Sequence, residues 1–231
     1  MDIVVQRLPQ TLWVVGMSYV VGILIALPIG LYSAYKQYSI FDNVGTFVSM
    51  IGYSVPPFFS GVFVIVIFSV QLGWLPSIYD TTHTVADWET FKFQVKQMVM
   101  PVMVLALQTT AQINRFMRSA SLDNLNQDYV RTARAKGLLE KVIINRHALK
   151  NSLLPVVTVI GIEFAFLMGG LVVTEQVFNL NGLGKLFVDS VMSSDYAMTQ
   201  ALVMVVVMIF VFTNFLVDIM YAWLDPRIRY A

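Results

Sequence analysis

The sequence predicts an all-α polytopic membrane protein with five transmembrane helices. Of its 231 residues, 57% are hydrophobic and only 13% are charged, whereas soluble domains carry about 25% charged residues. The mean hydropathy is +0.70, and several uncharged runs approach or exceed the ~20 residues that cross a bilayer core. The chain contains no cysteine, which excludes disulfides, a thiolate nucleophile and Cys-ligated metal sites.

The first predicted span covers residues 8–35, which carry no charge. Pro28 and Gly30 lie inside it and predict a kink, which a membrane helix tolerates when neighbours satisfy the freed carbonyls. A polar turn at 36–42 is followed by a shorter helix near 44–54 and a spanning helix over 57–72. The proline pair at 56–57 either marks a break that lines a pathway or simply begins the second helix, since proline is favoured in the first turn.

Two exposed loops separate the later spans. Residues 73–96 predict an amphipathic loop with aromatic side chains typical of a membrane interface. A second loop is predicted at 175–198, with the turn cluster Asn179–Gly184 inside it. The remaining spans are expected at 97–114, entered through Pro101 and closed by Arg115 and Arg118, at 152–174, and at 198–222, with Pro226 ending the last helix.

Polar side chains at membrane depth are candidates for lining a pathway. Glu163 lies within the fourth span, where a carboxyl group is costly and points to function by default. It could equally be a protonated or hydrogen-bonded packing residue, because Gly161, Gly169 and Gly170 beside it let helices approach closely. Gln112, Asn114 and Asn214 are the other candidates, and Asn214 could instead pair with the preceding helices, as could Asp218.

A basic segment, 128–150, lies between the third and fourth spans and predicts two short helices hinged at Gly137. Asp128 is expected to cap the first helix, and Gly137 suits a helix stop because it adopts positive φ at little cost. A basic helix–glycine–helix element fits a docking site for a partner, within a segment 119–150 of a single domain 1–231. The alternative is a solvated loop that only sets membrane orientation.

Lysine and arginine counts predict the orientation. Most of the fifteen basic residues fall in 115–150, with Lys36, Arg227 and Arg229 on the same side. The positive-inside rule places the basic segment and the C-terminus in the cytosol. Five spans then place the N-terminus outside, and we infer that a preceding membrane helix is missing from an originally six-span protein.

The segment Tyr129–Pro155 (YVRTARAKGLLEKVIINRHALKNSLLP) resembles the cytoplasmic loop of binding-protein-dependent ABC importer permeases. More narrowly, the chain resembles the peptide/nickel subfamily, which includes the B-type dipeptide and oligopeptide permeases. The similarity covers nearly the whole chain and includes the runs RLPQT (Arg7–Thr11), LGWLP (Leu72–Pro76), EQVF…GLG (Glu175–Gly184) and VDIMYAWLDPRIRY (Val217–Tyr230).

The chain departs from the family pattern in three places. Where the general motif has Glu-Ala-Ala before its glycine, this chain has Arg131, Thr132 and Ala133, and Lys150 stands in place of a proline. Both departures are typical of the peptide subfamily. Asn181 replaces the usual proline before GLG, so we expect that turn to differ.

The resemblance implies a permease subunit in the bacterial inner membrane that imports di- or oligopeptides, with nickel or glutathione as alternative cargo. It implies a second permease subunit, two cytosolic ATPases that hold ATP and Mg²⁺, and an external substrate-binding protein; no nucleic-acid partner and no cofactor in this chain are expected. The helix before Gly137 would be a coupling helix that sits in a cleft on the ATPase. Its expected contact residues are Tyr129, Arg131, Thr132, Ala133, Arg134, Ala135, Lys136 and Gly137.

An intramembrane enzyme is the alternative from another class. It would need a nucleophile–base pair or a metal cluster at membrane depth, and the two histidines, His83 and His147, both fall in predicted polar loops. No catalytic or metal site is therefore expected. An ion channel is disfavoured because no span carries a filter sequence. The chain also lacks the glycine-rich Lys-Ser/Thr nucleotide motif, so ATP chemistry is expected on other proteins.

Overall fold

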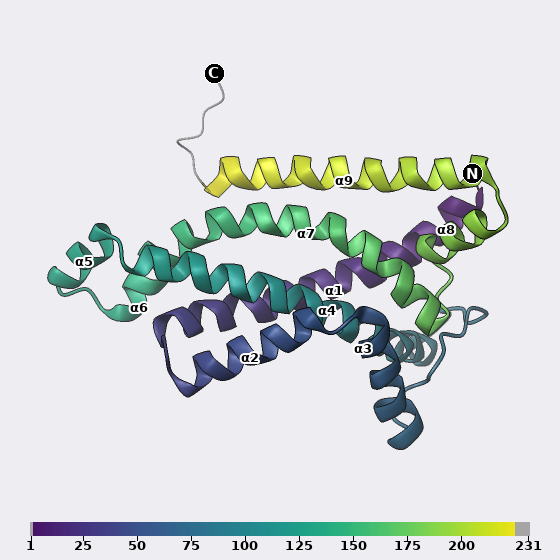
Figure 1. Ribbon diagram of the computed structural model, residues 1–231, viewed down its shortest axis with the longest axis horizontal. Coiled ribbons are helices and arrows are strands. Elements are labelled where there is room, and N and C mark those ends of the chain that lie inside the picture. Colours follow the sequence, from purple (N-terminus) through teal and green to yellow (C-terminus); the bar gives the residue numbers. More distant parts are fainter. Residues whose placement is uncertain (1, 225–231) are drawn as a thin grey trace.

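The computed structural model describes residues 2–224, apart from the side chains of 165–170, 223 and 224. Within that range the chain is entirely helices and connecting loops (Figure 1). The elements are α1 (Asp2–Tyr35), α2 (Ile40–Ser54), α3 (Pro57–Val64), the π-helix η1 (Ile65–Gln71), α4 (Trp88–Leu125), α5 (Asp128–Ala135), α6 (Glu140–Val142), the π-helix η2 (Ile143–Ala148), α7 (Leu149–Phe178), α8 (Leu183–Met192) and α9 (Tyr196–Leu224).

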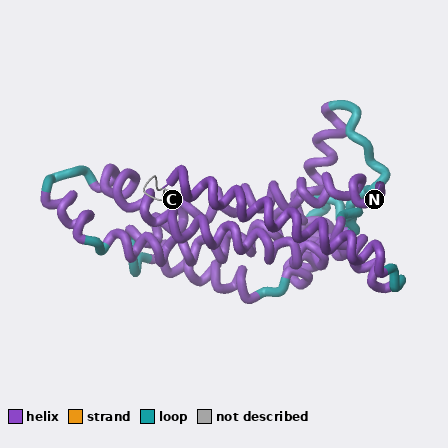
Figure 2. Tube along the Cα trace, turned by 90° about the horizontal axis from the view of Figure 1, so that it is seen from above, coloured by secondary structure: helices purple, strands orange, loops and turns teal. Residues whose placement is uncertain are grey.

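The long helices run along one axis, and the short ones lie at its two ends. Helices α5 and α6 form one end of the bundle, while α8 and the N-terminal end of α1 lie at the other (Figure 1). The loop 72–87 lies at this second end (Figures 1 and 2). We call these the hinge end and the α8 end.

Helix α4 is central and packs against α1, α2 and α7. Helix association in lipid gains little from the hydrophobic effect, so it depends on small residues that let helices pack closely. Two glycines of α1 allow such close packing against α4: a Cβ at Gly22 would lie 2.8 Å from Thr109 Cβ, and one at Gly30 would lie 2.8 Å from Met117 Cβ. They sit eight residues apart and so share a face of α1.

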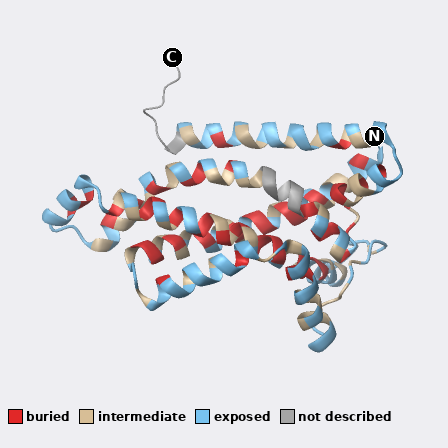
Figure 3. Ribbon diagram, viewed as in Figure 1, coloured by how far each residue is buried: buried red, intermediate tan, exposed pale blue. Residues whose placement is uncertain are grey.

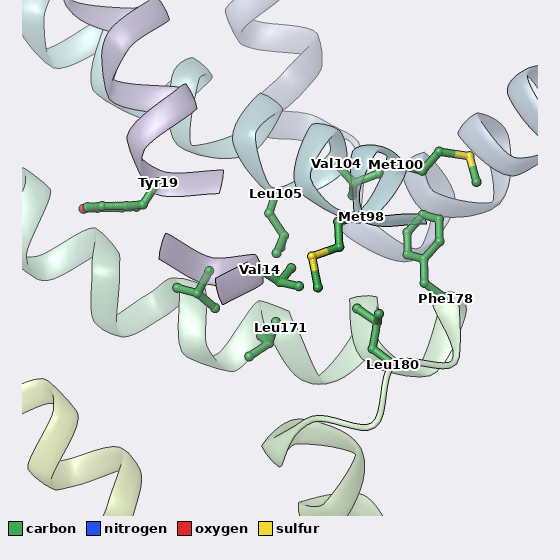
Figure 4. Close-up of a cluster of buried hydrophobic side chains, with 10 residues drawn as sticks. Val14, Tyr19, Met98, Met100, Val104, Leu105, Leu171, Phe178 and Leu180 are labelled. Carbon is green, nitrogen blue, oxygen red and sulfur yellow. The ribbon is translucent and has the colours of Figure 1, made fainter. Parts of the chain in front are cut away.

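The main core cluster lies where α1, α4 and the end of α7 meet. Its buried side chains include Val14 from α1, Leu105 from α4, and Leu171 and Phe178 from α7 (Figure 4). Leu180 joins them from the turn that follows α7. This cluster fixes the end of α7 close to the start of α4.

The outer faces of the bundle are apolar. By length and hydropathy, α1 and the range Tyr196–Ala222 can each cross a bilayer, with mean hydropathies of 2.2 and 2.6; α2 with Pro57–Gln71 adds a third crossing if that bent pair is one span. Only 11% of the α9 window is buried (Figure 3). The predicted third and fourth spans lie on α4 and α7, and the number of five spans stays a prediction.

The proline pair both starts a helix and turns the chain. Pro57 occupies the first turn of α3 after an extended Pro56, as expected for a helix start. The axes of α2 and the α3–η1 pair differ by 104° across this break. A role for the bend in lining a pathway stays a prediction.

Several predicted boundaries were wrong because local caps were overlooked. Helix α2 begins at Ile40, since Ser39 caps it by accepting a hydrogen bond from Asp42 N. Helix α4 begins at Trp88, inside the predicted loop 73–96, because Asp87 and Thr90 form a reciprocal capping box. It continues past Arg115 and Arg118 to Leu125, and Pro101 lies inside it rather than at its start.

The predicted loop 175–198 is mostly helical. Helix α7 extends to Phe178, α8 occupies Leu183–Met192 and α9 begins at Tyr196. Gly161 contacts α9 as the small-residue argument expected, since a Cβ there would lie 2.7 Å from Val217 Cγ2. Gly169 and Gly170 fall in the stretch whose side-chain surroundings are not described, and Pro226, Arg227 and Arg229 lie outside the described residues.

Candidate functional site

Helix α5 has one covered face and one exposed face. Val130 and Ala133 are buried against Ile143 of η2. The other predicted contact residues of this helix and its stop, namely Tyr129, Arg131, Thr132, Arg134, Ala135, Lys136 and Gly137, are all exposed. The structure therefore removes Ala133 from the exposed surface, because its small side chain serves close packing within the chain.

The start of α5 differs from the sequence prediction by one residue. Gln127 occupies the cap position and makes no side-chain capping bond, so Asp128 is the first helical residue rather than the cap. A carboxylate in the first turn still suits the positive end of the helix dipole. Asp128 Oδ1 lies 3.5 Å from Arg131 Nη1, an exposed pair that leaves Arg131 available.

Gly137 adopts φ +75°, in the left-handed region that the sequence predicted for it. No described atom lies within 4 Å of where its Cβ would be. Glycine is needed here for backbone conformation and not for space.

An ion pair spans this turn. Arg134 Nε lies 2.8 Å from Glu140 Oε1, and their side chains are 41% and 43% exposed. Sequence reasoning expected Arg134 to pair with a partner protein. In this chain Arg134 connects α5 to α6 across Gly137, and its pairing with a partner stays a prediction.

The predicted second short helix is not separate from the fourth span. Helical backbone runs without interruption through α6, η2 and α7, from Glu140 to Phe178. We call this continuous helix the rod. It reaches from the hinge end to the α8 end of the bundle (Figure 1).

Two of the four predicted pathway residues line a common cavity. Gln112 and Asn114 border a space of about 350 Å³ between α2 and α4, together with Ser49, Arg115 and Arg118. Asn114 is buried and donates from Nδ2 to Ser49 Oγ at 2.7 Å, so it also joins the two helices. Both helices contribute polar side chains to the lining of the cavity, so it can hold a small polar group.

Glu163 and Asn214 are not among the residues that line this cavity. Asn214 donates to Phe210 O, 3.2 Å away on its own helix, rather than to a preceding helix. Asp218 on the same helix is exposed. The structure thus divides the four candidates into a cavity pair and two separate residues.

A buried ion pair near the hinge end was missed by sequence reasoning. Asp42 accepts from Arg118 in a two-pronged pair, with Nε–Oδ1 at 2.5 Å and Nη2–Oδ2 at 2.7 Å. The Asp42 side chain is 1% exposed and also accepts from Tyr38 N. Both charges flank predicted spans, but nothing in their sequence spacing indicates that they meet.

A second missed arrangement lies at the α8 end. Glu175 is 1% exposed. Its Oε1 accepts from Thr11 Oγ1 of α1 at 2.8 Å, and its Oε2 accepts from Lys185 N of α8 at 2.9 Å. The runs RLPQT and EQVF…GLG therefore meet in space, a proximity that their similarity to a family could not reveal.

Neither histidine takes part in the Asp42 or Glu175 hydrogen bonds. His83 lies in the loop that precedes α4, and its Nε2 is 2.8 Å from Thr90 O in the first turn of that helix. Its ring packs edge-on against Phe93. His147 lies in η2 and is half-buried. Within residues 2–224 no grouping of three or more His, Asp or Glu side chains could hold a metal ion.

Comparison with known proteins adds three findings. The family described as "Binding-protein-dependent transport system inner membrane component" matches residues 26–230. The oligopeptide transport system permease protein AppB of Bacillus subtilis (strain 168) is 41% identical over 99% of this chain and 72% of its own length. The glutathione transport system permease protein GsiC of Pectobacterium atrosepticum is 39% identical over 97% and 69%.

Solved structures share the fold. An inward-facing MetNI methionine ABC transporter chain superposes with a TM-score of 0.77 at 18% identity, covering 97% of both chains. A chain of an amino acid ABC transporter with histidines gives 0.67 at 15% identity, over 95% of this chain and 93% of the other. At these identities the likeness concerns architecture alone.

Proposed function

Because this chain belongs to the binding-protein-dependent transport system inner membrane component family, we propose that it forms part of the membrane pathway for di- or oligopeptides. It is a permease subunit of an ABC importer, and such a permease works with ATPase and substrate-binding partners. The observation that carries the peptide assignment is the 41% identity, over nearly the whole chain, to an oligopeptide permease. Glutathione is the second candidate cargo, supported by the 39% identity to a glutathione permease.

Helix α5 is the proposed docking element for the ATPase. Its exposed face presents Arg131 and Lys136, while its covered face is fixed to the rod through Ile143. A helix that transmits movement from a partner must be attached to its own chain on one face and be free to contact the partner on the other. ATP and Mg²⁺ would be held by the ATPase subunits, where hydrolysis would occur.

Movement of α5 would reach the membrane through the rod. Gly137 sets the angle between α5 and α6, and Arg134–Glu140 spans the same turn. Nucleotide can bias the pathway only if the docked states differ in affinity for it. A rod that is helical from Glu140 to Phe178 would turn a displacement at the hinge end into a tilt along its whole length.

The proposed orientation places α5 and the C-terminus in the cytosol and the α8 end outside, facing the substrate-binding protein. The apolar outer faces of α9 and α2 would contact lipid and a second permease subunit. Cargo would pass a polar lining, for which Gln112 and Asn114 are the best-placed candidates because they border one cavity. Glu163 and Asn214 remain proposed pathway residues without that support.

The test is co-purification and transport with a matched pair of charge reversals. Arg131 and Lys92 each form an exposed i,i+3 ion pair, with side chains 71% and 50% exposed, on different helices. We expect Arg131→Glu to release the ATPase and stop uptake of labelled trialanine into proteoliposomes, and Lys92→Glu to do neither. Uptake of glutathione but not trialanine would reassign the cargo, and a wild-type chain that captures no ATPase would refute the proposal.

A further inference from the structure

Glu175 belongs to a hydrogen-bonded junction of three helices. The junction consists of Thr11 on α1, Glu175 on α7, and Gly182, Leu183 and Lys185 at the start of α8. Thr11 Oγ1 donates to Glu175 Oε1 and also accepts from Leu183 N at 2.8 Å. Thr11 and Glu175, which lie on other helices, therefore accept hydrogen bonds from backbone N–H groups in the first turn of α8.

These contacts replace an ordinary helix cap. The first N–H groups of a helix lack partners within it and are usually satisfied by a Ser, Thr, Asp or Asn at the cap position. Helix α8 has Gly182 there, with no side chain to serve. Glu175 and Thr11 supply the acceptors instead, and the carboxylate lies at the positive end of the α8 dipole.

The glycines of the GLG run are explained by the same geometry. A Cβ at Gly182 would lie 1.8 Å from Glu175 Oε1, so only glycine leaves room for the carboxylate. A Cβ at Gly184 would lie 2.7 Å from Val172 Cα, so the second glycine lets α8 approach the backbone of α7. Glu175, Gly182 and Gly184 are therefore required together for the packing of α8 against α7.

Other segments join the end of α7 at this point. Its C-terminal turn closes with Asn179 at φ 55° and a bond from Leu180 N to Glu175 O. Tyr79 N, in the loop 72–87, donates to Phe178 O at 3.0 Å. Val4, Leu183, Leu186 and Leu202 form one apolar cluster that joins α1, α8 and the start of α9.

The junction is thus attached to one end of the rod, and the rod's other end meets α5 at Gly137. We propose that Glu175 is a positioning residue for transport: it holds α1 and α8 to the end of α7, so that movement entering at α5 opens and closes the pathway at the α8 end. This inference rests on the proposed function. Without the carboxylate, α1 and α8 would follow the rod less closely, because Glu175 accepts from both Thr11 Oγ1 and Lys185 N.

The test measures peptide uptake and ATP hydrolysis together, in proteoliposomes containing the complete importer and its binding protein. The variants are Glu175→Gln, which keeps shape but replaces one acceptor by a donor, and Thr11→Val, which removes the hydroxyl. Thr11→Ser keeps the hydroxyl and is the conservative rescue.

We expect Glu175→Gln and Thr11→Val to lower the trialanine transported per ATP hydrolysed by about tenfold, the effect of losing a hydrogen bond to a charged group. Assembly and ATP hydrolysis are expected to stay near wild type, and Thr11→Ser is expected to keep the wild-type ratio. An unchanged ratio in Glu175→Gln overturns the inference. So does an equal fall in uptake, hydrolysis and assembly, which would show a folding role only.

A second readout follows the movement directly. Since this chain has no cysteine, spin labels at Ile162→Cys on α7 and Met192→Cys on α8 require no other substitution in it. We expect one narrow distance distribution with and without ATP in the parent, and a broadened one in Glu175→Gln. Equal distributions in both proteins contradict the inference. A wild-type importer without ATP-dependent peptide uptake contradicts the proposed function first.

Discussion

At the hinge end of the rod, Arg134 and Glu140 form an ion pair whose side chains are 41% and 43% exposed, and Gly137 stands in open space. At the α8 end, Glu175 is 1% exposed and Gly182 lies against its carboxylate. Exposed ion pairs contribute little to stability, while buried polar groups are costly when they lose a partner. The contrast indicates that contacts at the hinge end can rearrange at little cost in free energy, whereas packing within the chain fixes the geometry of the α8 end.

The largest effect that would break this contrast comes from adding one methyl group at the α8 end. Gly182→Ala places a Cβ on the Glu175 carboxylate, so backbone or side chain must shift. We expect a loss of about 3 kcal/mol in stability, at the upper end for overpacking. The measurement is the thermal unfolding midpoint in detergent.

Gly16→Ala is the control for that substitution, because no described atom lies within 4 Å of its Cβ position in α1. Alanine in a helix interior is favoured over glycine by about 0.5–1 kcal/mol. The midpoint of Gly16→Ala is therefore expected to stay the same or rise. Equal falls for both variants would mean that the junction is no tighter than an open helix face.

A second substitution asks whether burial, rather than position along the rod, makes a contact strong. Asp42 and Arg118 lie near the hinge end, but Asp42 is 1% exposed. Asp42→Asn removes the charge that Arg118 pairs with, and we expect a loss of about 2 kcal/mol, typical of hydrogen bonds to charged groups. Asp123→Asn, on the exposed surface of α4, is the control and is expected to leave the unfolding midpoint unchanged.

Local signals allowed the sequence to predict one part of this molecule well. The uncharged run 8–35 and the apolar run at 198–222 correspond to α1 and α9, and Gly137 has the positive φ that was expected of it. Apolar composition determines whether a segment can span a membrane, and glycine determines the backbone conformation at its own position. Tertiary contacts are not needed to recognise them.

Contacts between distant residues could not be predicted in this way. Thr11 and Glu175 are 164 positions apart, and only the packing of α1 against α7 and α8 brings them together. The same holds for Asp42 with Arg118 and for Ala133, which sequence reasoning placed on a partner-facing surface but which Ile143 covers. The sequence did not predict helix α8, because the side chains that cap it lie on other helices and no Ser, Thr or Asp stands at its cap position.

A third prediction separates backbone strain from coupling. Gly137 and Gly73 both have positive φ, +75° and +63°, and both have open space at the Cβ position. Alanine at either site should cost about 1 kcal/mol, because L-residues disfavour this region. Only Gly137→Ala is expected to lower peptide uptake, since Gly73 lies in the loop region after η1. A similar fall in both variants would attribute the loss to strain alone.

A fourth, smaller effect concerns Arg134. If it acts through Glu140, exchanging the charges by combining Arg134→Glu with Glu140→Arg restores the pair and most of the uptake lost in Arg134→Glu alone. If Arg134 contacts the ATPase, the double variant stays as inactive as the single one. Either single change is expected to alter stability by less than about 1 kcal/mol, given the exposure of the pair.

The smallest expected effect concerns helix caps: α8 is capped by side chains of other helices, whereas α4 is capped by its own neighbouring residues. Asp87 caps α4 through the exposed capping box, and the hydrogen bond from Thr90 N lowers the pKa of the Asp87 carboxyl. A lowered folded-state pKa stabilises this helix start above the unfolded pKa of about 3.9. That contribution is lost as the pH falls through the folded value.

Amide exchange of Phe91, whose N–H donates to Asp87 O, is therefore expected to quicken relative to the rest of α4 as the pH falls below about 4. Asp87→Asn keeps a capping oxygen without the titrating group, so its relative exchange should not change over the same range. Amides at the start of α8 provide the comparison, because their acceptor Glu175 is buried among three helices and opens only when those helices separate. If Phe91 and the α8 amides responded to acid alike, the exposed and the buried cap would be equivalent, and the proposed difference between adjustable and fixed regions would lose its physical basis.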